Sequence, residues 1–286
     1  MIDVPSGAPR YVAGARALAL STHPGPTVAV TTVATLLALV ADVPAGRTAL
    51  LCAAVLAGQA SIGWSNDWLD AERDRAVARS DKPVVQGAVT PAGLRRAALL
   101  AAATAVVLSL LLGIVPGLLL LLLVASGWAY NAGLKRTVWS GAGYVVGFGA
   151  LPAGVVTAAP GDPAVPWWLV AAGAMLGGAA HLANVAPDLE DDLATGVRGL
   201  PHRLGPRLSA ATSALLLAAA SLVLVLAPPG DPTATGWAAL ALAVPAAAVA
   251  ALSGTAARFR RLAFPAVMLL TVLDVALLLG GGATVA

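Results

Sequence analysis

Long uncharged runs of apolar residues recur along nearly the whole chain, with short polar segments between them. The runs are continuous rather than alternating, and a backbone in lipid must satisfy its amides within one segment, so each run predicts a membrane-spanning helix. A crossing needs about 20 residues. We therefore expect an all-α membrane protein with nine transmembrane helices, at approximately 25–41, 48–65, 93–113, 115–134, 138–159, 165–186, 208–227, 234–253 and 262–281. Only Pro116 separates the third and fourth spans, so a re-entrant pair is the alternative there.

The composition supports a membrane protein and excludes several other classes. The 286 residues are 59% hydrophobic and 11% charged, whereas soluble chains are about half apolar and about a quarter charged. Cys52 is the single cysteine, which excludes an intrachain disulfide and a cysteine-based metal site. The net charge of +3 is too small, and its carriers too dispersed, to predict nucleic-acid binding. The lipid bilayer is the partner that the composition requires.

The Lys and Arg residues fall almost entirely on one side of the predicted membrane. Sixteen of the 17 lie before the first span or in the loops after spans two, four, six and eight, and only Arg47 lies on the other side. The positive-inside rule then places the N-terminus in the cytoplasm and the C-terminus outside. The sequence thus predicts a multi-pass protein of the plasma or bacterial inner membrane, with those loops in the cytoplasm.

Acidic residues concentrate in two of the predicted cytoplasmic segments. These segments, 66–81 and 188–198, directly follow spans two and six and hold nine of the 14 Asp and Glu residues. If each helix continues past the membrane boundary, carboxylates spaced by four residues stack one turn apart on one helix face. Side chains with this spacing are Asn66, Asp70 and Asp74 in the first segment and Asp188 and Asp192 in the second.

Such stacked carboxylates repel one another unless a cation lies between them. Hard oxygen ligands in this arrangement suit Mg²⁺, which takes one or two carboxylates and completes its shell with water and substrate phosphate oxygens. A solvated acidic loop with local salt bridges is the alternative for either segment alone. The presence of two such segments favours metal binding, with the site at the cytoplasmic side of the membrane.

The spacing of the two segments predicts an internal repeat. Asp70 and Asp188 are 118 residues apart, and four spans separate them. We therefore expect a single domain over 1–286, built from two four-helix modules at approximately 17–134 and 138–257 and a ninth helix at 262–281. Two modules packed around a shared axis would bring the acidic segments to face each other across one cavity.

Three sequence runs resemble the signatures of the UbiA superfamily of intramembrane prenyltransferases. The run N-D-x-x-D-x-x-x-D at 66–74 is similar to the first signature, and D-x-E-x-D-x-x-x-G-V-R at 188–198 is similar to the second. The run Y-N-x-x-L-K-R at 130–136 resembles the tyrosine and basic residues that follow the fourth helix of the family. The resemblance covers nearly the whole chain, from Arg16 to the last helix.

The resemblance implies a helical fold around a central cavity, related to the isoprenoid synthases. It also implies two Mg²⁺ ions, one at Asn66, Asp70 and Asp74 and the other at Asp188 and Asp192. The chain departs from the family at Lys82, where many members carry Arg, and in the second segment, where Asp191 is an additional acid. The run 21–24 also differs from the Asn-containing segment of quinone-pathway members, which leaves the acceptor open.

The residues and the resemblance together predict Mg²⁺-dependent transfer of a prenyl group from a polyprenyl diphosphate to a small, lipophilic acceptor, aromatic or a quinone precursor. Metal ions and cationic side chains stabilise a leaving diphosphate without any proton transfer. The expected catalytic residues are Asp70, Asp74, Asp188, Asp192 and Tyr130. The expected diphosphate-binding residues are Arg75, Arg79, Lys82, Lys135 and Arg136, with Arg16 and Arg198 as weaker candidates. Terpene cyclisation by the same metal and diphosphate chemistry is the alternative, and a secondary transporter is a remote one.

Three polar residues inside the predicted spans have no assigned role. His181 could line the cavity or pack against a backbone carbonyl, and Asn184 lies one turn before Asp188 and could orient it. Asp274 lies within the last span, where a charge is costly and is neutralised, paired or functional. It has no evident partner in the sequence.

Overall fold

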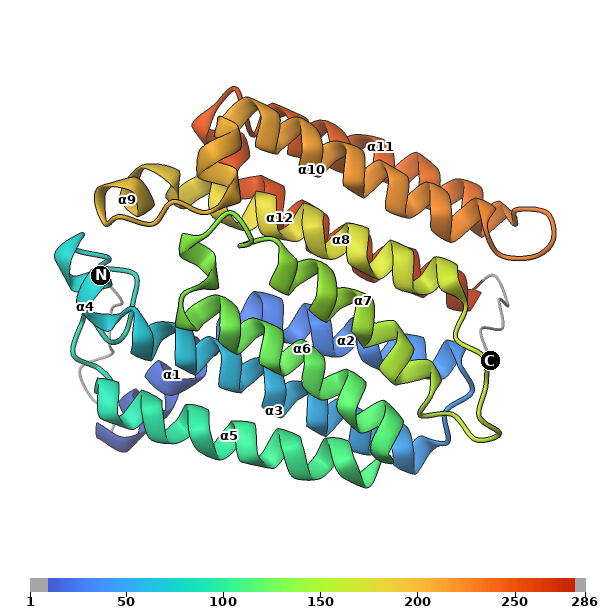
Figure 1. Cartoon of the computed structure of the whole chain (residues 1–286), viewed down its shortest axis with the longest axis horizontal. Coiled ribbons are helices and arrows are strands. Elements are labelled where there is room, and N and C mark those ends of the chain that lie inside the picture. Colours follow the sequence, from blue (N-terminus) through green and yellow to red (C-terminus); the bar gives the residue numbers. More distant parts are fainter. Residues whose placement is uncertain (1–9, 281–286) are drawn as a thin grey trace.

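The computed structural model describes residues 10–280, and over that range the chain consists of helices joined by turns and loops. The long helices lie side by side along the longest axis of the molecule (Figure 1), so the prediction of an all-α protein is confirmed. The α-helices are α1 (Arg10–Leu20), α2 (Pro24–Val40), α3 (Ala45–Leu69), α4 (Ala71–Ala76), α5 (Pro91–Leu111), α6 (Ile114–Ala132), α7 (Ala142–Val156), α8 (Trp167–Val185), α9 (Leu189–Ala194), α10 (Leu200–Leu226), α11 (Ala234–Leu252) and α12 (Ala257–Gly280). Two 3₁₀ turns, η1 (Leu134–Arg136) and η2 (Ala186–Asp188), follow α6 and α8.

Each predicted span coincides with one of the long helices. The number of membrane crossings is a separate question, because it depends on the length and hydropathy of each helix. Six helices in the described residues are long and apolar enough to cross a membrane, or seven if α1 and α2 form one bent span. Helix α7 has 15 residues, fewer than the roughly 20 that a full crossing needs. The count of nine crossings therefore stays a prediction. Residue 281, the end of the ninth predicted span, lies outside the described residues.

Six helices surround a central cavity and three lie outside them. The cavity is lined by the long helices α2, α3, α6, α7, α8 and α12, with the short helices α4 and α9 and the first residues of α10 at one end. Helix α5 packs against α3 and α6, α10 packs against α8, and α11 packs against α10 and α12. These outer helices form the lower and upper edges of the bundle in Figure 1. Gly117 of α6 lies directly on α5, since a Cβ there would overlap the backbone of Ser109, and small residues commonly allow such close contacts between membrane helices.

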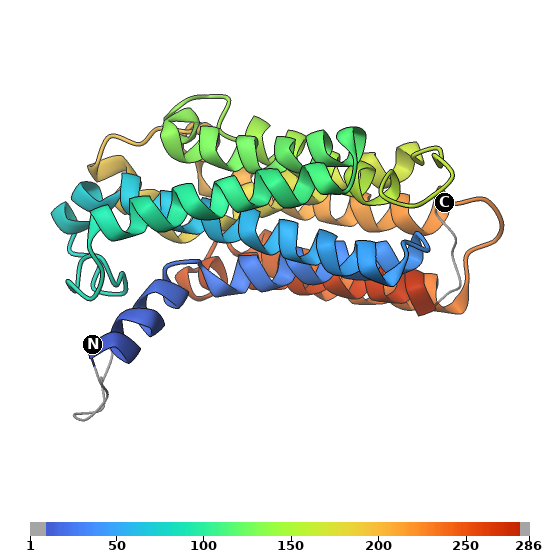
Figure 2. The ribbon, with the colours of Figure 1, turned by 90° about the horizontal axis from the view of Figure 1, so that it is seen from below.

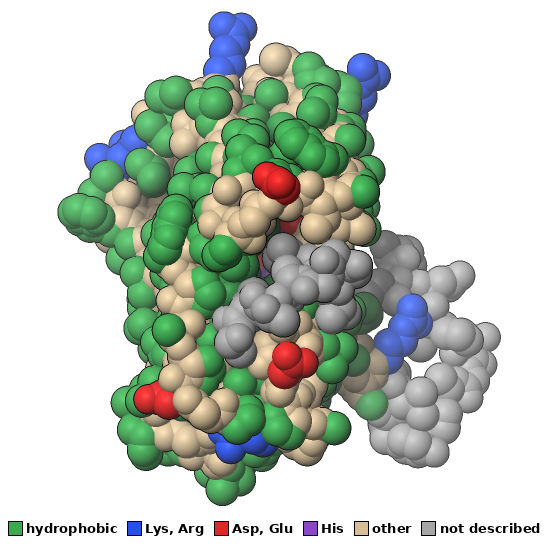
Figure 3. Space-filling view, turned by 90° about the vertical axis from the view of Figure 1, so that its right-hand side faces the viewer, with side chains coloured by type: hydrophobic (Ala, Val, Ile, Leu, Met, Phe, Trp, Pro, Cys, Tyr) green, Lys and Arg blue, Asp and Glu red, His purple; other side chains and the backbone are tan. Residues whose placement is uncertain are grey.

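Both acidic segments lie at the same end of the bundle. Helices α4 and α9 belong to these segments and lie at the left in Figure 1, whereas α12 ends at the right. The surface at that right-hand end is mostly hydrophobic or uncharged, with few charged side chains (Figure 3). The turned view shows α1 projecting away from the bundle (Figure 2), because it is bent by 62° from α2. The orientation of the two ends relative to the cell stays a prediction.

Candidate active site

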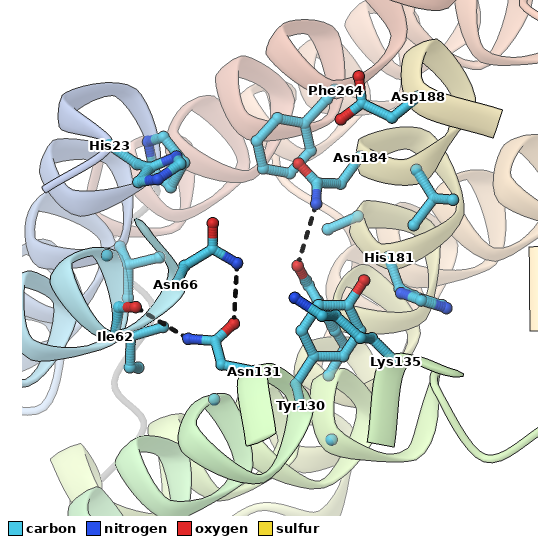
Figure 4. Close-up of a pocket in the computed structure, with 18 of the residues that line it drawn as sticks. His23, Ile62, Asn66, Tyr130, Asn131, Lys135, His181, Asn184, Asp188 and Phe264 are labelled. Carbon is cyan, nitrogen blue, oxygen red and sulfur yellow. Dashed lines mark hydrogen bonds between the residues drawn. The ribbon is translucent and has the colours of Figure 1, made fainter. Parts of the chain in front are cut away.

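A cavity of about 540 Å³ lies between the six inner helices and reaches the end of the bundle that carries the acidic segments. Its polar part is formed by side chains at the ends of these helices, which point toward one another in Figure 4. Its deeper wall is apolar, because it is lined from the middle of the helices by Val33, Leu123, Phe148, Leu151 and Leu176. The cavity therefore joins a charged chamber to an apolar one.

The first acidic segment enters the cavity from the end of α3. The helix is interrupted at Asp70, whose φ of −92° and ψ of 0° separate α3 from α4, so the expected continuous helix is wrong at this residue. The backbone N–H of Asp70 still donates to Asn66 (2.9 Å) and that of Asp74 to Asp70 (2.8 Å). This spacing keeps the three side chains on one face, where Asp70 and Asp74 are buried.

The second acidic segment enters from the end of α8. Here too the helix does not continue, since η2 contains Pro187 and a new short helix, α9, begins at Leu189. A proline lacks the N–H that would bond to the preceding turn, which explains the interruption. Asp192 is largely covered, at 14% exposed, whereas Asp188 at the rim is 41% exposed. Both side chains line the same cavity as the first segment.

Arginine side chains bridge the two segments across the cavity. Arg73 donates from Nη2 to Asp70 Oδ2 (3.1 Å) and from Nη1 to Asp192 Oδ1 (3.1 Å). Arg79 Nη1 lies 3.3 Å from Asp188 Oδ1. Single arginine side chains therefore connect the first segment to the carboxylates of the second, so the two segments face each other across one cavity.

Lys135 brings a further cation against the first segment. Its Nζ donates to Asp70 Oδ1 at 2.6 Å, and the lysine side chain is only 5% exposed. Burial lowers the pKa of Lys135, while the adjacent Asp70 carboxylate opposes that change. Burial likewise raises the pKa of Asp74, whose Oδ2 is enclosed and has no hydrogen-bond partner. Within this group of charged side chains, Asp74 therefore has a buried carboxylate oxygen that no neighbouring cation or N–H group satisfies.

Asn66 is oriented by a neighbouring amide on α6. Its Nδ2 donates to Asn131 Oδ1 (3.1 Å), and Asn131 Nδ2 donates in turn to the carbonyl of Ile62 (2.9 Å) and to Ser65 Oγ (2.8 Å). Figure 4 shows the hydrogen bonds of Asn131 with Asn66 and with Ile62 at one side of the cavity. Because its nitrogen is engaged in these hydrogen bonds, the amide oxygen of Asn66 is the atom that could bind a cation.

The donor set fits Mg²⁺ that is shared with a phosphate. Within residues 10–280, no three His, Cys, Asp or Glu side chains lie close enough together to hold a metal ion by themselves. Mg²⁺ does not need such a cage, because it usually takes one or two carboxylates and keeps water or substrate oxygens. The unpartnered Oδ2 of buried Asp74 is an open ligand position of that kind.

A second cluster of charged groups stands beside the cavity. Lys82 Nζ donates to Asp67 Oδ1 (2.6 Å), and His23 Nε2 lies 2.9 Å from the same oxygen. Asp67 is 1% exposed, and its burial raises the cost of leaving it unpaired. His23 adopts a left-handed conformation (φ 57°) at the bend between α1 and α2, which is strained before a proline. These contacts hold the histidine on the cavity wall.

Gly63 allows this bend to lie directly on α3. A Cβ at this position would overlap the backbone carbonyl of Thr22. We expect Gly63→Ala to lower the free energy of unfolding by about 1–3 kcal/mol or more, because the overlap is with backbone rather than a flexible side chain. Thermal melts of the purified protein in detergent measure this. Gly46→Ala in the same helix is the control, since a Cβ there meets no atom within 4 Å; equal melting temperatures for the two variants would contradict the contact.

Aromatic rings line the boundary between the polar and apolar chambers. Tyr130 and Tyr144 meet edge to face, with ring centroids 5.2 Å apart, and His181 lies 5.7 Å from Tyr130. Asn184 Nδ2 donates to the hydroxyl of Tyr144 at 3.3 Å, one of the hydrogen bonds drawn in Figure 4. Electron-rich ring faces placed here attract a positive charge that forms beside them.

Comparison with known proteins identifies the family. The sequence model of the UbiA prenyltransferase family matches residues 27–277. The chain belongs to the UbiA prenyltransferase family. Solved structures share its fold: a UbiA homologue from Aeropyrum pernix K1 has a TM-score of 0.73 at 21% identity, over 89% of this chain and 97% of that one. A UbiA homologue from Archaeoglobus fulgidus bound to GPP and Mg²⁺ has a TM-score of 0.70 at 13% identity, over 91% and 99%.

A digeranylgeranylglyceryl phosphate synthase also has this fold, with a TM-score of 0.66 at 14% identity over 94% of this chain and 99% of that one. No curated protein sequence matches the chain. Membership of the family confirms the expected class of enzyme, a prenyltransferase. It does not support the transporter alternative.

The structure of this UbiA-family prenyltransferase brings most of the expected site residues together. Those that line the cavity are Asn66, Asp70, Asp74, Arg79, Lys82, Tyr130, Lys135, Asp188 and Asp192. Lys82 is turned toward Asp67 and His23 rather than toward the carboxylates expected to bind metal. Their roles in binding and catalysis remain predictions.

Four expected diphosphate-binding residues lie outside the cavity, which does not favour that role. They do not line the cavity and their side chains are exposed: Arg16, Arg75, Arg136 and Arg198. Helix geometry explains two of them, because neighbouring residues of a helix point in different directions. Arg75 follows the buried Asp74, and Arg136 follows the buried Lys135.

Other cavity residues were not predicted as part of the site. Arg73, Asn131 and His23 line it, as does His202, whose Nε2 lies 3.4 Å from Asp192 Oδ2. Arg73 is three residues from Asp70, a spacing that favours an ion pair on a helix and that could have indicated it. His23 is 44 residues from its partner Asp67, so no local pattern marks it.

The structure also places the three polar residues that had no role. His181 lines the cavity and hydrogen-bonds through Nε2 to Ser140 Oγ at 3.0 Å, rather than to a backbone carbonyl. Asn184 contacts Tyr144 and does not hydrogen-bond to Asp188. Asp274 has a partner after all, because Ser221 Oγ on α10 donates to its Oδ2 at 3.0 Å.

Proposed function

We propose that the protein transfers a prenyl group from a polyprenyl diphosphate to a small lipophilic acceptor, aromatic or a quinone precursor, with Mg²⁺ as cofactor. The observation that carries this proposal is the pair of acidic segments that face each other at the mouth of an apolar cavity. The family supports it, as do the homologues of the same fold whose structures hold GPP or DMAPP with Mg²⁺.

The polar chamber would bind the diphosphate and its metal ions. Asn66, Asp70 and Asp74 would hold one Mg²⁺, and Asp188 and Asp192 the other. When bound, the ions neutralise charge that develops on the diphosphate oxygens. Side chains already present there add to this effect, and they would exchange a carboxylate for a phosphate partner as the donor binds. These cationic residues are Lys135, Arg73 and Arg79.

The apolar chamber would hold the prenyl chain and exclude water. Cleavage of the bond between prenyl C1 and the diphosphate oxygen leaves an allylic cation, and water that reached it would give a prenyl alcohol. The rings of Tyr130 and Tyr144 lie where the two chambers meet and would stabilise this cation. The acceptor atom then bonds to C1, and the acceptor loses a proton.

A product screen tests the proposal. Purified protein is incubated with Mg²⁺ and geranyl, farnesyl or geranylgeranyl diphosphate, with and without a panel of phenolic and quinone-precursor acceptors, and products are identified by mass spectrometry. A prenylated acceptor supports the proposal, and chelation of the metal should abolish its formation until Mg²⁺ is restored. A cyclic hydrocarbon formed without acceptor would instead establish terpene cyclisation. Failure to consume any donor would contradict both.

A further inference from the structure

Arg73 occupies the space between the two acidic segments. Its guanidinium touches Asp70 Oδ2 and Asp192 Oδ1, both at 3.1 Å, and Nη2 lies 3.7 Å from Asp74 Oδ1. The arginine is 20% exposed, and its three partners are at most 14% exposed. One side chain therefore contacts carboxylates from both of the segments expected to bind metal.

This position makes Arg73 a competitor of a metal ion that arrives alone. A divalent cation at Asp70 or Asp192 would come next to a half-buried guanidinium, and like charges at such distances repel strongly outside bulk water. A diphosphate changes the balance, because it offers the guanidinium two oxygens in the planar geometry that it binds best. Metal and diphosphate together can then replace the contacts that Arg73 makes now.

We propose that Arg73 joins the two acidic segments while the site has no donor and turns to the donor diphosphate when it binds, so that the site accepts metal and diphosphate together. This inference rests on the proposed function, since it assumes that the cavity binds a diphosphate. In this proposal Arg73 binds the diphosphate, and in the absence of diphosphate it lowers the affinity of the site for a metal ion. The planar fork of Arg places a separate nitrogen on each segment, Nη2 on Asp70 and Nη1 on Asp192, whereas the ammonium group of Lys is a single point charge.

The proposal predicts opposite changes in two affinities. Binding of Mn²⁺ alone, followed by electron paramagnetic resonance of the free ion, should be about tenfold tighter in Arg73→Gln than in the wild type, because a neighbouring positive charge is removed. Binding of radiolabelled inorganic pyrophosphate at saturating Mg²⁺ should be about tenfold weaker, because a charge-assisted pair is lost. Arg75→Gln is the matched control: it removes the same charge from the same helix, but from an exposed side chain outside the cavity.

A second variant covers the case in which Arg73→Gln folds poorly. Arg73→Lys keeps the charge without the fork, so it should bind Mn²⁺ as weakly as the wild type and yet bind pyrophosphate more weakly. A purely structural Arg73 would weaken both affinities when replaced, and a bystander would change neither; either result would overturn the proposal. If the two affinities change as expected but no prenyl diphosphate is consumed, the proposed function fails and the role of Arg73 stands. If the protein consumes prenyl diphosphate but the substitutions leave both affinities unchanged, the proposed function stands and the role of Arg73 fails.

Discussion

Replacing Asp70 by Asn should lower the rate of prenyl diphosphate consumption by about 10²–10³-fold or more, the loss typical when one group that stabilises developing charge is removed. The substitution keeps the shape of the side chain but removes a carboxylate that we propose as a metal ligand. It also removes the carboxylate that Lys135 and Arg73 share. Asp188→Asn should have the same direction of effect from the opposite wall. Release of pyrophosphate from geranyl diphosphate measures both.

The control for these variants is Asp191→Asn, an equal change of charge at an exposed residue that does not line the cavity. Removing one partner of a buried ion pair costs about 3–5 kcal/mol of stability. Membrane insertion and the melting temperature of each variant must therefore be measured along with the rate. Normal turnover in both Asp70→Asn and Asp188→Asn would refute the metal assignment.

Replacing Lys135 by Met should also reduce the turnover number by about 10²–10³-fold. The lysine is buried against Asp70 and lines the cavity, where under the proposed function its ammonium group would bind the diphosphate. Methionine has a similar volume and no charge. The turnover number and KM for geranyl diphosphate separate a loss of charge stabilisation from a loss of binding.

The adjacent residue supplies the comparison for Lys135. Arg136→Met removes the same charge from the same 3₁₀ turn, but its side chain is exposed and lies outside the cavity. We expect its turnover to remain within about twofold of the wild type, as for most surface substitutions. Equal losses in the two variants would mean that the loop acts as a whole and that the direction of Lys135 has no special role.

The sequence predicts the positions of the long helices well because lipid restricts the choice. An apolar run must become a helix to satisfy its backbone, and α11 (Ala234–Leu252) lies within one residue of the expected 234–253. The expected span at 138–159 is less accurate, since α7 covers only Ala142–Val156. Hydropathy cannot detect that Ser140 is used to hydrogen-bond His181 and the backbone N–H of Leu200.

The sequence locates the acidic residues of the site and three of its cations, Arg79, Lys82 and Lys135, but it does not separate the cations that face the cavity from their neighbours. Arg73 and Arg75 differ by two positions, and Lys135 and Arg136 by one, yet only the first of each pair lines the cavity. Which of them points inward depends on the local turn, including the break at Asp70, and no spacing rule supplies that break. Contacts such as His23 with Asp67 depend on the packing of distant segments. The internal repeat of four-helix modules stays a prediction.

Of the three outer helices, α5 and α11 contribute no residue to the lining of the cavity, and α10 contributes only Pro201 and His202 at its start. Side chains of α5 and α11 that face away from the bundle can therefore change while the reacting groups keep their places. Substitutions at these side chains can therefore adapt the protein to a thicker or thinner bilayer, or to different lipids, with little effect on the reaction. Low overall identity between such proteins is compatible with one conserved reaction centre.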